Sequence, residues 1–308
     1  MSLSASGSPS RDVVIWNPRS GKGRGAARFA ALRAQLGKDD ALWETSAPGA
    51  AETLARQAAE EGYQRVFAIG GDGTVHEVVN GLLSANAPTP ALVVVPVGSA
   101  NDYAHSVRFE ARAAGRSPLD LQPVDVGQIS STSGRRRFFV DGVGIGLNGM
   151  VTEESRRIHR LQGVLLYGLA TARALWKLDR APEMAVQLNG GVPLVGPTML
   201  LSVLLAQREG NFLIAPQARL GDGWFNVVHA ALTSRWEALR LLPRIALWGL
   251  PQVYPGLTRS LCQSVRVSAP QPLVAHADGE LFCVPADGVT ELDIEILPGR
   301  LQVALWEG

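Results

Sequence analysis

The amino-acid sequence predicts an α/β domain built on a parallel sheet, followed by a mostly antiparallel β-sandwich domain. In the first 130 residues, short apolar runs alternate with helix-like segments, a pattern typical of strand–helix–strand units around a parallel sheet. From about residue 124 onwards, short β-like runs dominate instead. A length of 308 residues is that of two domains at about 150 residues each.

The first domain is expected at residues 11–128. β-type apolar runs predict strands at 13–16, 66–69 and 91–95, and another strand-like run precedes Thr45. Composition and apolar spacing predict helices at 26–36, 50–61 and 75–83.

The second domain is expected at residues 129–297, with a last strand at about 298–306 that returns to the first domain. Its strands are predicted at 137–140, 184–188, 199–205, 225–229, 264–267, 281–284, 292–296 and 301–306. Two helical stretches interrupt them, at 161–178 and 235–248.

Charge and hydropathy exclude several classes of protein. Lys and Arg number 29 against 28 Asp and Glu, so no net charge attracts the chain to nucleic acid. The longest apolar stretches are under ten residues, whereas a membrane-spanning helix needs about twenty. The first ten residues are polar and contain no secretory apolar segment. We expect a cytoplasmic protein in which Cys262 and Cys283 are reduced and buried.

Glycine-bearing loops follow three of the predicted strands of the first domain. They span residues 17–25, 70–74 and 96–102, and the carboxyl ends of parallel strands meet at one edge of a sheet. Glycine lets backbone N–H groups approach phosphate oxygens, and the helix that follows residue 74 adds partial positive charge. Asp72 is the exception in this set, because a carboxylate repels phosphate. It fits if it binds the shell of Mg²⁺ or accepts hydrogen bonds from ribose or from loop backbone.

Two other interpretations of these loops stay open. Each loop alone is also explained as a tight turn. Gly21, Gly23 and Ala26 match a relaxed dinucleotide-binding fingerprint, although this match leaves the loop at 70–74 unexplained. The sequence contains no Walker P-loop motif.

Several motifs together resemble the diacylglycerol kinase catalytic-domain family, the soluble bacterial lipid kinases related to sphingosine kinases. The first three are Asn-Pro-x-Ser-Gly-Lys at 17–22, Gly-Gly-Asp-Gly-Thr-x-x-Glu-x-x-Asn-Gly at 70–81 and Pro-x-Gly-Ser-x-Asn-Asp at 96–102. The resemblance continues through 125–127, 142–146, 214–216, 222–223 and 278–280, in the family's order. The element at 70–74 alone is shared with NAD kinases and is similar to phosphofructokinases, so the resemblance implies a first domain of that type.

The resemblance implies an ATP site at the cleft between the domains. The residues that it assigns to the nucleotide are Asn17, Ser20, Gly21, Lys22, Thr45, Gly70, Gly71, Asp72, Gly73, Thr74, Ser99 and Asn101. Thr45 has a plain alternative as a helix or loop cap. Ser99 stands where threonine is usual in the family, a change that keeps the hydroxyl.

The resemblance also implies Mg²⁺. Asp125 is expected near the catalytic ion, or else as a turn residue between the domains. A structural Mg²⁺ is expected at Asp222, with the backbone carbonyls of Arg219 and Trp224 as partners. The alternative for Asp222 is a hairpin-like turn before the strand at 225–229.

The family analogy assigns the catalytic base to Glu280, with Asp278 next and Asp72 as a rival. Phosphoryl transfer needs mainly positioning, Mg²⁺ and an oriented nucleophile, and a carboxylate accepts the proton. The alternative for Asp278-Gly-Glu280 is a type I′ hairpin turn. Asn148 stands where an acidic residue is common, which puts the identity of the substrate in doubt.

The resemblance implies a lipid substrate at a membrane surface, transient membrane association and a place in phospholipid biosynthesis. Basic residues precede an apolar run at 156–167, and arginines are interleaved with Trp and Leu at 235–248. Both patterns suit helices attracted to anionic headgroups, although ordinary helices on a sheet explain them too. The five histidines show no metal-ligand spacing. An NAD kinase-like enzyme and a non-catalytic nucleotide or lipid sensor remain alternatives. The acceptor lipid and the oligomeric state stay open, a homodimer included.

Overall fold

The computed structural model describes residues 11–35, 41–158, 163–178, 180–232 and 234–307. Residue contacts divide the chain into two compact units. The first comprises residues 1–124 with 299–308, and the second comprises residues 125–298. The first unit is α/β and the second is mostly antiparallel β, which confirms the predicted fold class.

The first unit alternates strands and helices along the chain. Its elements are β1 (Asp12–Trp16), the 3-10 turn η1 (Ser20–Gly23), α1 (Arg24–Arg33), β2 (Ala41–Glu44), α2 (Ala50–Glu60), β3 (Arg65–Gly70), α3 (Asp72–Ser84), β4 (Ala91–Pro96) and α4 (Asp102–Ala113). Residues 303–305 of the last strand, β18 (Glu291–Leu305), pair in parallel with β4. The parallel order is therefore β2-β1-β3-β4-β18.

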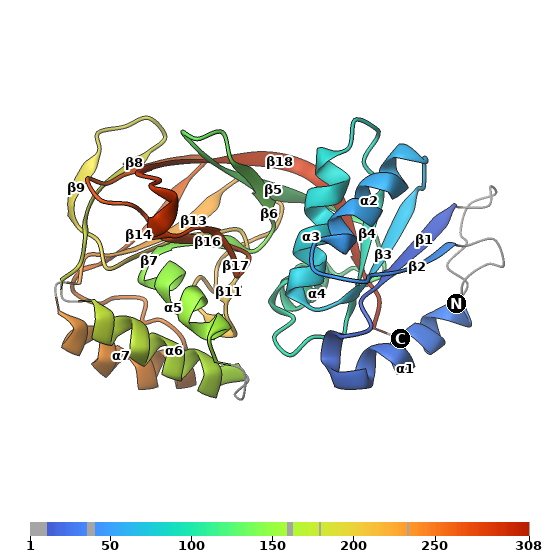
Figure 1. The fold of residues 1–308 in the computed structure, drawn as a ribbon, viewed down its shortest axis with the longest axis horizontal. Helices are drawn as coiled ribbons and strands as arrows, with labels where there is room; N and C mark the ends of the chain where they lie inside the picture. Colours follow the sequence, from blue (N-terminus) through green and yellow to red (C-terminus); the bar gives the residue numbers. More distant parts are fainter. Residues whose placement is uncertain (1–10, 36–40, 159–162, 179, 233, 308) are drawn as a thin grey trace. The chain divides into compact units, whose positions relative to one another are not determined.

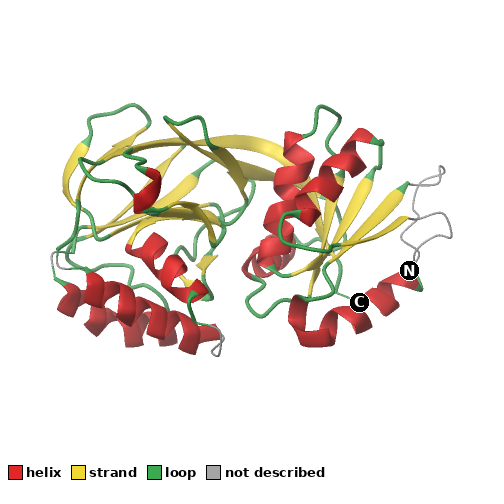
Figure 2. Ribbon diagram, viewed as in Figure 1, coloured by secondary structure: helices red, strands yellow, loops and turns green. Residues whose placement is uncertain are grey.

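The sheet of the first unit lies between helices (Figure 2). Val14 and Phe67 on one face form a buried cluster with Leu32 of α1. Helices α2 and α3 cover the other face (Figure 1) and lie close together. A Cβ atom at Gly81 of α3 would lie 2.2 Å from the Glu52 carbonyl oxygen of α2, so the contact between these helices requires glycine.

The second unit contains most of the strands. Its elements are β5 (Gln122–Ser131), β6 (Arg136–Phe139), β7 (Gly142–Gly146), α5 (Leu147–Arg156), α6 (Gly163–Lys177), β8 (Glu183–Leu188), β9 (Leu194–Pro197), β10 (Leu200–Leu204), β11 (Arg208–Glu209), β12 (Phe212–Leu213), β13 (Phe225–Ala230), α7 (Arg235–Trp248), β14 (Leu257–Cys262), β15 (Ser264–Ser268), β16 (Ala275–Ala277), β17 (Glu280–Cys283), η2 (Pro285–Asp287) and most of β18. The strands β14-β13-β10-β7-β16-β17 form one antiparallel sheet in that order.

Two sheets of the second unit enclose one apolar core. The six-stranded sheet contributes residues such as Ile145 and Leu201, and the sheet that contains β8, β15 and β18 contributes residues such as Val186 and Ile294. All four side chains are fully or almost fully buried. Helices α5, α6 and α7 belong to a second apolar cluster, which includes Leu147, Leu175 and Leu241 together with residues of β10 and β13.

Several features differ from the sequence-based expectation, and strands β5, β7, β9 and β14 are among the elements that were not predicted. The two predicted strands at 292–296 and 301–306 are one continuous strand, because Gly299 adopts a φ of +58° and carries the strand through the Pro298–Gly299 segment. Helices α4 and α5 were not predicted. Helix α4 follows the glycine-bearing loop after β4, and α5 follows the glycine-rich strand β7 directly, so glycine weakens the local helix signal at both starts.

The two cysteines are free and buried, as predicted. Cys262 lies on β14 and Cys283 on β17, which are the opposite edges of the six-stranded sheet. Burial raises the pKa of Cys262 to about 12 and that of Cys283 to about 11, so both remain neutral thiols at physiological pH.

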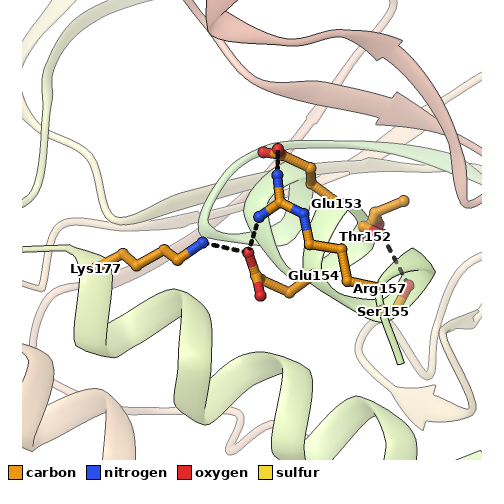
Figure 3. A network of polar contacts seen from close by, with 6 residues as sticks. All are labelled: Thr152, Glu153, Glu154, Ser155, Arg157 and Lys177. Carbon is orange, nitrogen blue, oxygen red and sulfur yellow. Dashed lines mark hydrogen bonds and ion pairs between the residues drawn. The ribbon is translucent and has the colours of Figure 1, made fainter. Parts of the chain in front are cut away.

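A carboxylate ties α5 to α6 (Figure 3). The Glu154 side chain is 6% exposed, and its Oε1 lies 2.5 Å from both Lys177 Nζ of α6 and Arg157 Nη1. Arg157 also contacts Glu153 at 2.6 Å. Hydrogen bonding to Lys177 holds the pKa of Glu154 below its usual value, although burial opposes this shift.

We expect Glu154→Gln to lower the free energy of unfolding by about 1 kcal/mol at pH 7, since its partners are half exposed and screened by solvent. A lowered pKa in the folded state means that the contribution is present above the unfolded value of 4.5 and is lost as the pH falls below it. Denaturant unfolding of the two proteins should therefore differ at pH 7, and the difference should shrink as the pH falls below 4.5 and through the lowered pKa of folded Glu154. Glu153→Gln, which removes only a surface pair, is the control. A difference that grows as the pH falls below 4.5 would contradict the assigned cause.

Candidate functional site

Three loops meet at the carboxyl edge of the parallel sheet in the first unit. Asn17, directly after β1, donates from Nδ2 to Thr74 Oγ1 at 3.0 Å. A Cβ atom at Gly21 would lie 2.1 Å from the Val97 carbonyl oxygen, and one at Gly98 would lie 2.7 Å from Gly71 Cα. The loops after β1, β3 and β4 are thus in direct backbone contact, and glycine is required where they touch.

The topology places these loops where ligands bind in open α/β sheets. Strand order runs from β1 outwards to β2 on one side and to β3 and β4 on the other. The loops after β1 and β3 therefore flank the topological switch point of the sheet, where the strand order reverses. In open α/β sheets of this kind, ligands bind in a crevice at that point. Helix α3, 13 residues long, begins at Asp72 in the second of these loops. The first amide groups of a helix have no acceptor within the helix and attract anions.

Asp72 braces the third loop. Its Oδ2 accepts a hydrogen bond from the Asn101 backbone N–H at 2.9 Å, and its Oδ1 accepts one from Tyr103 N–H at 3.4 Å. The sequence left several roles open for Asp72. The structure shows one of them, a carboxylate that accepts hydrogen bonds from backbone N–H groups. Asn101 has a φ of +53° and donates from Nδ2 to the Gly98 carbonyl oxygen.

The other nucleotide-site candidates lie in or beside the same loops. Ser20 begins η1, and its N–H donates to the Asn17 carbonyl oxygen at 3.1 Å. Thr45 follows β2, is 9% exposed and donates its N–H to the Trp16 carbonyl oxygen at 2.9 Å. Ser99 is exposed in the third loop. The side chain of Lys22 lies outside the described part of the structure.

In the second unit, Asp278 and Gly279 form the two-residue turn between β16 and β17. Their φ angles are +51° and +77°, the signature of a type I′ hairpin. The Asp278 carboxylate accepts hydrogen bonds from the backbone N–H groups of Val140, Asp141 and Gly142, and its Oδ1 lies 2.8 Å from Asp141 N. The structure thus uses Asp278 to fasten the turn to the chain before β7.

Glu280 stands at the start of β17 with a half-exposed side chain. Its Oε2 accepts a hydrogen bond from Arg156 Nη2 at the end of α5. This partner was not predicted from the sequence, where Arg156 and Arg157 belong to a segment expected near a membrane. In the structure both arginines pair with carboxylates of their own unit. A separation of 124 residues between Arg156 and Glu280 leaves no local signal for the pair.

The predicted metal residues gather at one turn of the second unit. Asp125 is 2% exposed, its Oδ2 accepts from the Gly223 N–H at 2.7 Å, and its own N–H donates to the Leu220 carbonyl oxygen. Asp222 Oδ1 accepts from the Trp224 N–H at 3.0 Å. Asp125 is therefore beside the Asp222 turn. The described residues hold no group of three or more His, Cys, Asp and Glu side chains arranged to bind a metal ion.

Three of the described histidines make side-chain contacts with neighbouring polar groups. His229 Nε2 lies 2.9 Å from Thr198 Oγ1, and burial lowers its pKa. His76 Nε2 lies 3.3 Å from Asn80 Nδ2. His276 belongs to a network with Glu209, described below. His159 lies outside the described residues.

Helices α6 and α7 run side by side (Figure 1). Both helices expose large apolar side chains to solvent. On α6, Leu165 and Trp176 are 73% and 71% exposed. On α7, Trp248 is 75% exposed. Other exposed residues of the same helices are Leu169, Arg173, Lys177, Trp236, Arg240, Arg244 and Leu247. None of the described helices is both long and apolar enough to cross a membrane.

Comparison with known proteins identifies two family models along the chain. Residues 11–129 match the diacylglycerol kinase catalytic domain, and residues 141–305 match the YegS C-terminal NAD kinase beta sandwich-like domain. The chain is 28% identical over 280 residues to a diacylglycerol kinase of Bacillus subtilis, covering 88% of this chain and 89% of that protein. It is 25% identical over 280 residues to a diacylglycerol kinase of Staphylococcus aureus, covering 88% and 86%.

Two solved structures share the fold. A diacylglycerol kinase from Bacillus anthracis superposes with a TM-score of 0.69 at 17% identity, covering 96% of each chain. Yeast NADH kinase complexed with NADH superposes with a TM-score of 0.52 at 8% identity, covering 98% of this chain and 84% of that one.

Proposed function

We propose that this lipid kinase transfers the terminal phosphate of ATP to the hydroxyl group of a membrane lipid such as diacylglycerol or phosphatidylglycerol. The chain belongs to the family that joins a diacylglycerol kinase catalytic domain to a YegS-type C-terminal domain. The observation that carries this proposal is the contact of three glycine loops at the edge of the parallel sheet, at Gly21, Gly71 and Gly98.

In this proposal the first unit holds the nucleotide. The backbone amides of residues 71–73, at the start of α3, hydrogen-bond the phosphates, and those of residues 98–99 approach from the third loop. The Asn17–Thr74 hydrogen bond fixes the first loop against the second. Lys22, which follows Gly21 in the first loop, adds the cationic group suited to a phosphate.

Mg²⁺ is proposed to arrive with ATP. This ion typically takes one or two carboxylates and otherwise phosphates and water, so it needs no dedicated cluster of protein ligands. Asp72 is the carboxylate of the three-loop site, and its two hydrogen bonds to loop amides fix its orientation. When bound, the ion neutralises the charge that develops on the transferring phosphate.

The second unit is proposed to hold the lipid and the base. Glu280 accepts the proton of the lipid hydroxyl, and its hydrogen bond to Arg156 orients the carboxylate. Asp278 is an unfavourable second candidate, since its oxygens accept three backbone N–H groups. We assign Asp125 and Asp222 a role in shaping the 220–224 turn, where a structural Mg²⁺ would use Asp222 and neighbouring carbonyl oxygens.

The exposed face of α6 and α7 is proposed to dock on an anionic membrane. A helix of a water-soluble unit usually turns its apolar residues inwards, yet α6 exposes Leu165, Leu169 and Trp176 along its length. Arg173, Arg240 and Arg244 are exposed on the same two helices. Aromatic and apolar side chains flanked by cations are the composition of interfacial helices.

We expect the double substitution Trp176→Ser and Trp248→Ser to weaken binding to vesicles containing phosphatidylglycerol about tenfold or more, since burying one large apolar side chain contributes about 1.5 kcal/mol or more. Vesicle sedimentation measures the effect. Val192→Ser with Val195→Ser, which removes two exposed apolar side chains elsewhere in the unit, is the matched control. Equal binding by both double variants would contradict this docking face.

The proposed reaction is tested by supplying γ-labelled ATP and Mg²⁺ together with a lipid extract in one reaction and NAD in another. The expected result is a labelled lipid, whose chromatographic identity names the acceptor. Labelled NADP without labelled lipid would replace the proposal by an NAD kinase-like activity. ATP binding without transfer to either acceptor would favour a sensor.

A further inference from the structure

A polar row crosses the outer face of the six-stranded sheet in the second unit. Gly144 of β7 pairs with Ser202 of β10 on one side and with His276 of β16 on the other. Their strand neighbours, such as Ile145 and Leu201, point into the sandwich core. Since successive residues of a strand face opposite sides, Ser202 and His276 project away from the core.

Gly144 leaves a notch in this row that a carboxylate fills. A Cβ atom at Gly144 would lie 2.5 Å from Glu209 Oε1 and 2.4 Å from His276 Nε2. Glu209 accepts hydrogen bonds from Ser202 Oγ at 2.7 Å, from Asn148 Nδ2 at 2.9 Å and from His276 Nε2 at 3.0 Å. Three donors thus satisfy a largely buried carboxylate, as burial of a charge requires.

The hydrogen bonds fix the tautomer of His276. The Gly279 backbone N–H lies 3.2 Å from His276 Nδ1, and a backbone amide is only a donor. Nδ1 is therefore the acceptor, and Nε2 carries the hydrogen donated to Glu209. The ring is 4% exposed and links Glu209 to the turn.

This turn immediately precedes Glu280. Asp278 fastens one side of the turn to the backbone before β7, and His276 holds the other side through Gly279. We propose that His276, oriented by Glu209, is a positioning residue that sets the place of the Glu280 carboxylate. The inference rests on the proposed role of Glu280 as the base.

Two substitutions separate positioning from general support of the fold. In His276→Asn the amide Oδ1 stands near the former Nδ1 and accepts from Gly279, but the bond to Glu209 is lost. In His276→Gln the longer side chain donates to Glu209, but the acceptor for Gly279 is lost. We expect kcat to fall about 10- to 100-fold in His276→Gln, since a displacement of about 1 Å costs up to about 100-fold. The Asn variant should stay within about threefold of wild type, and KM for ATP should not change.

Stability should follow the opposite order. Glu209 keeps its donor in the Gln variant and loses it in the Asn variant, so denaturant unfolding should find His276→Asn the less stable of the two. His229→Gln removes another buried imidazole of the same sheet, which contacts Thr198 and not the turn, and should leave kcat unchanged. Losses of kcat that follow the order of stability would overturn the inference.

Hydrogen exchange distinguishes this inference from the proposed function. Exchange of the backbone amides at 278–281 should accelerate in His276→Gln relative to wild type and His229→Gln. Two results would overturn the positioning role of His276 and leave the proposed function intact. One is unchanged hydrogen exchange in His276→Gln. The other is an unchanged kcat in His276→Gln when Glu280→Gln abolishes activity. Faster exchange together with an active Glu280→Gln protein would instead remove Glu280 as the base, and with it the catalytic part of this inference.

Discussion

Replacing Glu280 by glutamine is expected to lower kcat for lipid phosphorylation by about 10²- to 10⁴-fold, the usual contribution of a positioned general base. Glutamine keeps the size of the side chain and an oxygen that accepts from Arg156, so the local structure should persist. What it removes is the ability to take a proton from the lipid hydroxyl. ATP affinity should not change, because the loops that we assign to the nucleotide lie in the other unit.

Steady-state kinetics with saturating ATP and a mixed-micelle lipid substrate measure this effect. Glu183→Gln is the matched control, since Glu183 is an exposed carboxylate on β8 of the same unit and should leave kcat unaltered. If Glu280→Gln keeps kcat within about threefold of wild type, the base must be sought at another carboxylate, Asp72 first.

Replacing Gly21 by alanine is expected to destabilise the first unit and to remove nucleotide binding. Gly21 has a φ of +65°, and a Cβ atom there would lie 2.1 Å from the Val97 carbonyl oxygen. The left-handed backbone costs an L-residue about 1–2 kcal/mol, and the steric conflict adds about 1–3 kcal/mol. Relief of that conflict pushes apart the first and third loops, which together are assigned to the phosphates.

Gly115→Ala separates the cost of the left-handed backbone from the cost of the steric conflict. Gly115 has a φ of +66°, nearly that of Gly21, but a Cβ atom there meets no atom within 4 Å. We expect this variant to lose about 1–2 kcal/mol of unfolding free energy and to bind ATP like wild type. Denaturant unfolding and titration calorimetry with ATP measure the pair. Equal effects of the two substitutions would show that the contact between the loops carries neither stability nor binding.

The convergence of the glycine loops was predictable from the sequence for a topological reason. Strands 13–16, 66–69 and 91–95 read as buried parallel strands, and the carboxyl ends of such strands share one edge. Glycine at 21, 71 and 98 then signals close backbone approach. A Cβ atom at any of these three positions would lie only 2.1–3.3 Å from an atom of a neighbouring loop.

Partners that come from distant segments were not predictable. Arg156 and Glu280 meet only because α5 contacts β17, and Glu209 reaches His276 from β11, a strand of a different sheet from β16. No local period in the sequence records such contacts. For the same reason the sequence could not decide whether Asp125 lies near a metal ion or in a turn. The backbone N–H that it binds belongs to Gly223, which is 98 residues further along the chain.

The orientation of α6 shows a second limit of sequence reasoning. Apolar residues occur all round this helix, so the pattern alone does not say which face is buried. Ala174 and Leu175 point into the unit and are fully buried, whereas Leu165 and Trp176 point to solvent. Which side chains of α6 are buried depends on the elements that pack against the helix. The exposed apolar face is therefore seen only in the structure.

The most direct test of the account is a crystal structure of the protein with Mg²⁺ and a non-hydrolysable ATP analogue. Phosphate oxygens are expected within hydrogen-bond distance of the backbone N–H groups of Gly71, Asp72 and Gly73 and of the Gly98 loop, with the Asn17–Thr74 contact retained. A nucleotide bound with its phosphates away from these loops would contradict the central claim, whatever activity the protein shows.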